Sequence, residues 1–190
     1  DDNDLIIIDE IDGDSIDGEA GNDTVQFRIT PGDVTVDLNL GTASSTAGGA
    51  MTLSNIENVD DQSGDTNIIG SDGNNLIIAR DGADTIDARD GDDTIIINDG
   101  LDTIDGGLGS DGVRIISNLD SFVNLGAGSY DVDNIAGTLI SIENAIGGAG
   151  NDSLIGSAGD NYLDGGAGND FINALSGNDT IFGGVGSDFV

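Results

Sequence analysis

Aspartate and glycine recur at fixed positions in this chain, and together they could do one kind of chemistry. When the sequence is divided into units of nine residues, starting at Gly70 and again at Gly147, a pattern appears. Each unit of the two runs has glycine at position four, aspartate or asparagine at position six and an aliphatic residue at position eight. A short carboxylate in a tight glycine turn brings side-chain and backbone oxygens together. Such oxygens suit a hard divalent cation, above all Ca²⁺.

The three columns predict how each unit folds. Position four holds Gly21, Gly73, Gly82, Gly91, Gly100, Gly109, Gly150, Gly159, Gly168, Gly177 and Gly186. Position six holds Asp23, Asn75, Asp84, Asp93, Asp102, Asp111, Asp152, Asn161, Asp170, Asp179 and Asp188. Position eight holds Val25, Ile77, Ile86, Ile95, Ile104, Val113, Leu154, Leu163, Ile172, Ile181 and Val190. We therefore expect a six-residue turn followed by a short strand with one inward side chain.

The charge of the chain restricts its partners. The 190 residues include 37 acidic and 4 basic ones, with a net charge of -33, no histidine and no cysteine. Phosphate binding needs Lys and Arg, so we expect no nucleic acid and no direct binding to anionic membranes. Without cysteine there are neither disulfides nor thiolate metal sites. Disorder is the alternative for so acidic a chain, but the regular aliphatic spacing favours a fold that cations neutralise.

The pattern resembles the RTX (repeats-in-toxin) haemolysin-type calcium-binding nonapeptide, G-G-x-G-x-D-x-U-x. Units such as GGAGNDSLI from Gly147, GGAGNDFIN from Gly165 and ARDGDDTII from Ala88 carry the resemblance. It implies an all-β fold, a right-handed parallel β-roll (β-solenoid) with two nonapeptides per coil. It also implies calcium between turns of neighbouring coils. The earlier turn would give the carbonyls of positions two and four and its position-six carboxylate. The later turn would give the carbonyls of positions one and three and its own carboxylate.

Carried onto this chain, the resemblance implies about five good Ca²⁺ sites and a few weaker ones. In the C-terminal run, Gly148, Gly150 and Asp152 would face Gly165, Ala167 and Asp170; Gly166, Gly168 and Asp170 would face Gly183, Val185 and Asp188; and Ser157, Gly159 and Asn161 would face Ala174, Ser176 and Asp179. In the middle run, Arg80, Gly82 and Asp84 would face Ile97, Asp99 and Asp102; Arg89, Gly91 and Asp93 would face Gly106, Leu108 and Asp111; and a weaker site would join Ser71, Gly73 and Asn75 to Ala88, Asp90 and Asp93. Gly18, Ala20 and Asp23 are expected as N-terminal ligands.

The middle run departs from the glycine consensus at positions one and two, where it has alanine, isoleucine and arginine. If the family geometry holds, only the carbonyls of these residues bind and their side chains point outward. Asn75 and Asn161 keep a ligand oxygen but carry no charge.

The repeats divide the chain into five parts. Residues 1–26 are degenerate repeats, residues 61–114 and 147–190 are regular β-roll, and residues 27–60 and 115–146 break the register. The two breaks resemble each other: Leu53-Ser54-Asn55-Ile56-Glu57-Asn58 echoes Leu139-Ile140-Ser141-Ile142-Glu143-Asn144. We interpret them as duplicated, calcium-poor coils that continue the solenoid, with a loop from Ser44 to Gly49.

Other chemistry finds less support in the sequence. Glu57 and Glu143 could suggest a catalytic carboxylate pair, but they are equivalent positions of a duplication, which favours a structural role. The threonine column (Thr24, Thr85, Thr94, Thr103 and Thr180) could form a flat face for ice or glycan, although ordinary β-propensity explains it better. The sequence has no histidine base, no G-x-S-x-G elbow and no phosphate loop with lysine.

Two functions stay open. The first is a non-catalytic calcium-binding segment of a secreted or cell-surface bacterial protein, such as an S-layer protein or adhesin, exported by type I secretion as the resemblance implies. Self-association and a cell-surface polysaccharide would be its further partners. The second is the calcium-dependent accessory module of a larger secreted enzyme, for example a protease, lipase or epimerase. The chain starts and stops within its repeats, so we expect it to be part of something larger.

Overall fold

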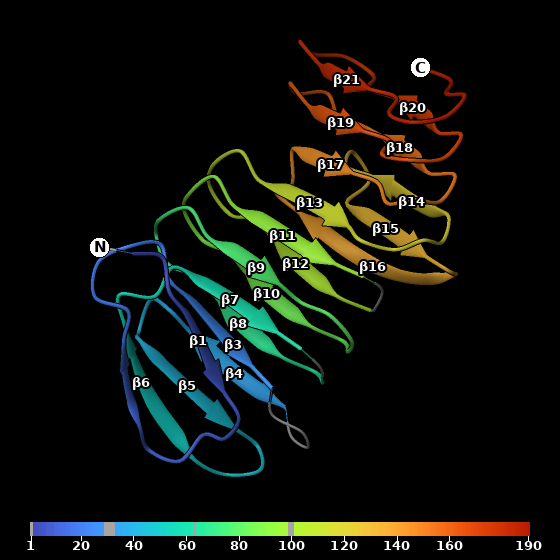
Figure 1. The fold of residues 1–190 in the computed structure, drawn as a ribbon. Helices are drawn as coiled ribbons and strands as arrows, with labels where there is room; N and C mark the ends of the chain where they lie inside the picture. Colours follow the sequence, from blue (N-terminus) through green and yellow to red (C-terminus); the bar gives the residue numbers. More distant parts are fainter. Residues whose placement is uncertain (1, 29–32, 63, 99–100) are drawn as a thin grey trace.

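The protein folds into stacked coils of short β-strands. A computed structural model describes residues 2–28, 33–62, 64–98 and 101–190. This described part contains strands and no helix, and the strands follow one another along the stack from the N-terminal to the C-terminal end (Figure 1). Accordingly, no helix among these residues is long and apolar enough to cross a membrane.

The strands form two sheets. The first sheet is parallel throughout and contains, in spatial order, β1 (Leu5–Ile8), β3 (Thr24–Phe27), β7 (Asn58–Asp61), β9 (Leu76–Ile78), β11 (Thr94–Ile97), β13 (Gly112–Ile115), β17 (Asn144–Ile146), β19 (Tyr162–Asp164) and β21 (Thr180–Phe182). The second contains β2 (Ser15–Asp17), β6 (Ala50–Ser54), β5 (Thr42–Ser45), β4 (Val34–Asp37), β8 (Asn67–Ile69), β10 (Thr85–Asp87), β12 (Thr103–Asp105), β16 (Ile135–Ile140), β15 (Ser129–Val132), β14 (Ser121–Asn124), β18 (Ser153–Ile155) and β20 (Phe171–Asn173).

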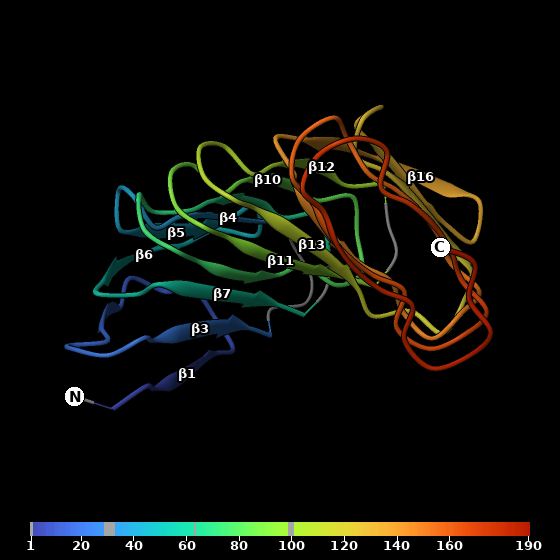
Figure 2. The ribbon, with the colours of Figure 1, turned by 90° about the horizontal axis from the view of Figure 1, so that it is seen from above.

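The register of the pairs confirms the predicted fold class. In the second sheet Thr85 pairs with Thr103, and in the first Thr94 pairs with Gly112, each a step of eighteen residues. Successive nonapeptides therefore alternate between the sheets, and two of them complete one coil. The result is an all-β parallel β-roll, and Figure 2 shows its C-terminal coils nearly end-on as superposed loops.

The core is a ladder of aliphatic side chains between the sheets. Position-eight residues from Val25 to Ile172 are buried, with Ile77, Ile95 and Leu163 fully so. Ile181 is only partly buried and Val190 is 65% exposed, because coils cover the last coil on one side only. Each coil thus contributes few apolar groups, and the stack as a whole makes the core.

One expectation about the middle run is wrong. Ala79, Ala88 and Ile97, at position one of their units, are buried in the core rather than pointing outward. The strand continues into this position, so a second side chain of the unit alternates inward. Position two behaves as expected: the guanidinium of Arg89 lies outside the turn, where it donates to Asp72 at 2.8 Å.

The two segments that break the register have the same structure. In each, an antiparallel meander is inserted in the second sheet: β4, β5 and β6 in one, β14, β15 and β16 in the other. A single strand, β7 or β17, then returns to the first sheet. Ser44 lies in β5 instead of the expected loop, because this strand pairs along its length with β4.

Candidate metal centres in the turns

The position-six carboxylates point into the stack of turns rather than to solvent. Asp23, Asp84, Asp93, Asp111 and Asp170 are each at most 2% exposed. They lie in two rows, because each turn leads into a strand of one sheet or the other. Buried carboxylates need partners, so the contacts of each oxygen decide what the rows can do.

One oxygen of each carboxylate is used to join neighbouring coils. The Oδ1 of the later coil accepts the position-six N–H of the earlier coil, as in Asp93 N–H to Asp111 Oδ1 at 2.8 Å. The same bond joins Thr66 to Asp84, Asn75 to Asp93, Asp84 to Asp102, Asp152 to Asp170, Asn161 to Asp179 and Asp170 to Asp188. The position-six side chains thus form a continuous inner ladder along each run.

The second oxygen, Oδ2, of Asp23, Asp84, Asp93, Asp111 and Asp170 is buried and has no partner among the described residues. An ionised oxygen in this situation is costly unless a cation compensates it. Asp152 differs, because its Oδ2 accepts from Gly148 N–H at 2.8 Å.

The burial of these carboxylates also changes their pKa values. Burial raises the pKa of Asp84 to about 7 and that of Asp93 to about 6, with neighbouring aspartates adding to the shift. Burial likewise raises the pKa of Asp111 and Asp170. The turns therefore disfavour negative charge when no cation is bound.

Backbone carbonyls converge on the same space. A Cβ added at Gly147 would lie 2.5 Å both from Asp152 Oδ2 and from the carbonyl oxygen of Gly165 in the next coil. At Gly165 it would collide in the same way with Asp170 Oδ2 and the Gly183 carbonyl. Carboxylate and carbonyl oxygens of two coils thus share a space that glycine leaves open. Ca²⁺ takes six to eight oxygens, so the residues present fit this ion.

The structure places the predicted partners on adjacent coils. The six turn pairs named above are the pairs that the inner ladder joins, although Asp99 lies outside the described residues. Several carbonyls expected to bind calcium also accept a hydrogen bond between turns, such as Arg89 O from Leu108 N–H and Gly166 O from Val185 N–H. A carbonyl oxygen has two lone pairs, so this bond leaves one for an ion.

Position five forms a second ladder that the sequence analysis missed. Here the side chain of the earlier coil accepts from the later coil, as in Asn74 Oδ1 from Asp92 N–H and Asp92 Oδ1 from Ser110 N–H, both at 2.9 Å. Asn151, Asn169 and Ser187 continue the same arrangement near the C-terminus. The recurrence of Asn and Asp at position five was the available signal. This outer, exposed ladder runs in the opposite sense to the inner one and fixes the spacing of the turns.

Tyr130 ends one of the inner ladders. Its hydroxyl accepts from Asp102 N–H at 3.2 Å and donates to Asp102 Oδ2 at 2.7 Å. It therefore takes the place that the next position-six carboxylate would occupy. The ring reaches this point across Gly137, where any Cβ would collide with it. The side chain is 1% exposed, and burial raises its pKa, so the hydroxyl stays protonated.

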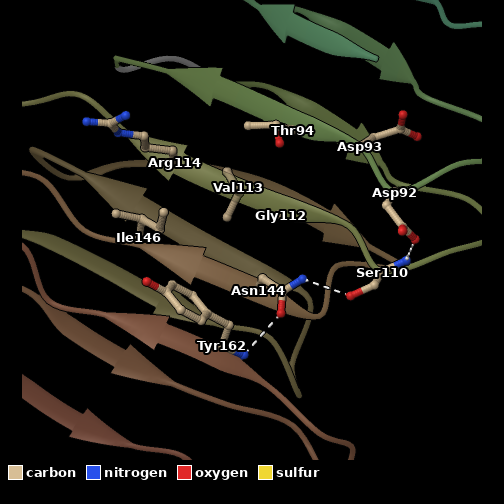
Figure 3. Close-up of a pocket in the computed structure, with 10 residues that line it drawn as sticks. All are labelled: Asp92, Asp93, Thr94, Ser110, Gly112, Val113, Arg114, Asn144, Ile146 and Tyr162. Atoms are coloured by element: carbon tan, nitrogen blue, oxygen red, sulfur yellow. Dashed lines mark hydrogen bonds between the residues drawn. The ribbon is translucent and has the colours of Figure 1, made fainter. Parts of the chain in front are cut away.

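Outside the turns, a groove opens on the first sheet above Gly112, whose missing side chain leaves a hollow (Figure 3). Asn144, between Ser110 and Tyr162, lines it and bonds to both. The groove presents no nucleophile with an adjacent base. Within the described ranges no three acidic side chains gather at one point.

Comparison with known proteins points to the same turns. The profile of a family described as RTX calcium-binding nonapeptide repeat matches in four copies, over residues 6–26, 61–95, 141–172 and 157–190. These segments cover more than half of the chain. A search of curated proteins gave no match.

Replacing Tyr130 tests its role at the end of the ladder. Tyr130→Phe removes two hydrogen bonds to Asp102, one of them to a carboxylate, so we expect a loss of about 1.5–3 kcal/mol in the free energy of unfolding. Urea denaturation at saturating calcium measures it. Tyr162→Phe, on the exposed face of the first sheet, is the control and should stay within about 0.5 kcal/mol of the parent. Equal effects for the two variants would contradict the assignment.

Acid should partly replace calcium. The pKa values of Asp84 and Asp93 are higher in the fold than the ordinary value of 3.8, so these groups favour the fold at low pH and lose that contribution as pH rises through about 6 to 7. In excess chelator, circular dichroism should show β-structure increasing as pH falls from 8 to 5 (a span of about three units around these values). Asp84→Asn with Asp93→Asn should weaken this dependence, whereas Asp72→Asn, at an exposed site, should not. A circular dichroism spectrum that does not change with pH in excess chelator would contradict this prediction.

Proposed function

The chain belongs to the family of RTX calcium-binding nonapeptide repeats, and on that premise we propose that it is a structural β-roll of a secreted or cell-surface bacterial protein that folds on binding calcium after export. The observation that carries the proposal is the set of buried position-six oxygens, such as Asp84 Oδ2 and Asp170 Oδ2, that have no partner among the described residues. We assign the calcium ions to the spaces beside these oxygens, which gives about five good sites in the regular runs.

Charge explains why folding should wait for calcium. The net charge of -33 opposes a compact state, and each bound ion adds two positive charges where carboxylates are buried. Extracellular calcium modules bind at about 10⁻⁴–10⁻³ M. In a cytoplasm poor in calcium the chain would remain unfolded, which suits export by type I secretion, and it would fold outside the cell.

The proposed role is structural rather than catalytic, of the S-layer or adhesin type. The position-six acids of the turns are engaged in the inner ladder, and the groove above Gly112 lacks a catalytic set. The alternative is a calcium-dependent folding and secretion module attached to a secreted protease, lipase or epimerase. The same calcium sites would serve that role, so the residues beyond this segment decide between the two.

A cell-surface polysaccharide is a proposed partner, besides self-association. Asn67, Thr85, Thr103 and Thr138 are exposed and stand side by side on adjacent strands of the second sheet. Such a row offers regularly spaced polar groups to a repeating ligand. On the first sheet Leu76 and Gly112 interrupt the equivalent row on either side of Thr94, so the second sheet is the favoured face.

A calcium titration tests the proposed function. Followed by circular dichroism, the chain should be largely disordered in chelator and gain β-structure cooperatively at calcium concentrations of about 10⁻⁴–10⁻³ M. Native mass spectrometry should then count several tightly bound ions. Asp170→Asn should weaken two ions, because this carboxylate faces both Asp152 and Asp188, whereas Asp188→Asn should weaken one.

Asp160→Asn is the matched control, because Asp160 is an exposed position-five residue that bonds only to the outer ladder. It should leave the ion count unchanged. A β spectrum that persists in excess chelator, or a count of two ions or fewer (against the roughly five expected), would contradict the proposal.

A further inference from the structure

Two of the turns that lead from the second sheet to the first are shorter than the others. Position one of a regular turn donates its N–H to the coil that follows, and Gly106 donates in this way to the carbonyl of Ile140. Ser141 therefore occupies position one of its coil. Asn144 N–H bonds to the Asp111 carbonyl, the bond that position seven makes elsewhere. Only Ser141, Ile142 and Glu143 remain between these points, where a regular turn has six residues.

The glutamate of each short turn occupies the position that the position-six aspartate has in a regular turn. Glu143 Oε2 accepts from Asp111 N–H at 2.9 Å, and Glu57 Oε2 accepts from Asp23 N–H at 2.8 Å. These are the inner-ladder bonds, made here by a longer side chain. Asn55, Ile56 and Glu57 form the short turn of the N-terminal copy, and Asn55, like Ser141, has a positive φ.

The aspartate facing each glutamate has an unpaired oxygen. Asp111 and Asp23 are both 0% exposed, and Oδ2 of each has no partner in the part of the chain that the structure describes. A Cβ added at Gly106 would lie 2.7 Å from Asp111 Oδ2 and would also collide with the Ser141 carbonyl. At Gly18 it would meet Asp23 Oδ2 at 2.7 Å and the Asn55 carbonyl. The same convergence of carboxylate and carbonyl marks the regular turns at Gly147 and Gly165.

We propose that each of these two junctions binds an additional calcium ion, held by Asp111, Ser141 O and Glu143 at one and by Asp23, Asn55 O and Glu57 at the other. The proposal rests on the calcium binding assigned above to the regular turns. Compared with a regular site, the short turn lacks the carbonyl of position three. A bidentate glutamate or a water molecule completes the shell, since Ca²⁺ accepts both.

On its opposite side, toward the next coil, each short turn offers no comparable ion site. The amide of Asn161 donates to the Glu143 carbonyl at 2.8 Å, and that of Asn75 donates to the Glu57 carbonyl at 2.7 Å. An N–H group stands where a ligand oxygen would be needed. A Cβ added at Gly73 or Gly159 would meet only its own turn's serine hydroxyl, because the short turn leaves that flank open. Each glutamate therefore serves an ion on one side only.

The length of the side chain is the specific feature. In a chain whose other ladder acids are aspartates, Glu57 and Glu143 stand at the two short turns. The extra methylene lets the carboxylate reach the ladder from a turn with three residues fewer. Burial raises the pKa of Asp111, and the Glu143 carboxylate adds to the shift, so the two acids repel each other when no cation lies between them.

The test is a count of bound ions at saturating calcium. Glu143→Gln can still accept the Asp111 N–H, so the fold should persist while the calcium count by native mass spectrometry falls by one. Glu57→Gln should do the same, and the double variant should lose two. Glu143→Asp keeps the charge but not the reach, and should also lose one ion. Glu10→Gln, at an exposed position outside the ladder, should lose none.

Anomalous diffraction from calcium in crystals of the parent chain should locate a peak between Asp111 and Glu143. A parent that binds ions only in the regular turns, or a Glu143→Gln variant that keeps the full count and this peak, would overturn the junction sites and leave the proposed function standing. A parent that binds no calcium at all would overturn both.

Discussion

The structure depends on rows of buried carboxylates held one coil apart. Parallel strands stack at about 4.8 Å, so acids such as Asp93 and Asp111 in neighbouring coils come close together away from water. One oxygen of each is satisfied by a backbone N–H. The other, where it has no protein partner, requires either a proton or a cation. Because the aliphatic ladder contributes only one or two side chains per unit, ligation in the turns must supply much of the energy of folding.

The rows of carboxylates also explain how the fold accommodates the two segments that break the nonapeptide register. Each duplicated segment inserts an antiparallel meander in one sheet and a short turn in the other. In the C-terminal copy Tyr130 ends one ladder with a hydroxyl in place of a carboxylate. In the N-terminal copy Ala43 pairs with Met51 where Tyr130 pairs with Gly137, so the large residue has moved to the other strand. Met51 and Tyr130 are both buried, but only Tyr130 bonds to the ladder.

The nonapeptide period was enough to predict the parallel β-roll and the facing turns, because one spacing of eighteen residues sets both the strand register and pairs such as Asp170 with Asp188. It could not place Tyr130, whose contact with Asp102 arises from an antiparallel meander that the period does not describe. It also missed the inward side chains of Ala88 and Ile97, which depend on how far each strand continues. The role of Glu143 followed only when hydrogen bonds showed that its turn lacks three residues, although its rarity among aspartates was a signal.

The central claim is that calcium holds the coils by ligation and not by general screening of charge. Small-angle X-ray scattering can separate the two, because about 1 M sodium chloride shortens the Debye length to about 3 Å without supplying a divalent ligand acceptor. We predict that the chain in chelator stays expanded at this salt concentration, and that millimolar calcium (about 10⁻³ M, the upper range for extracellular sites) compacts it at low salt. Full compaction in sodium chloride with chelator present would contradict the account.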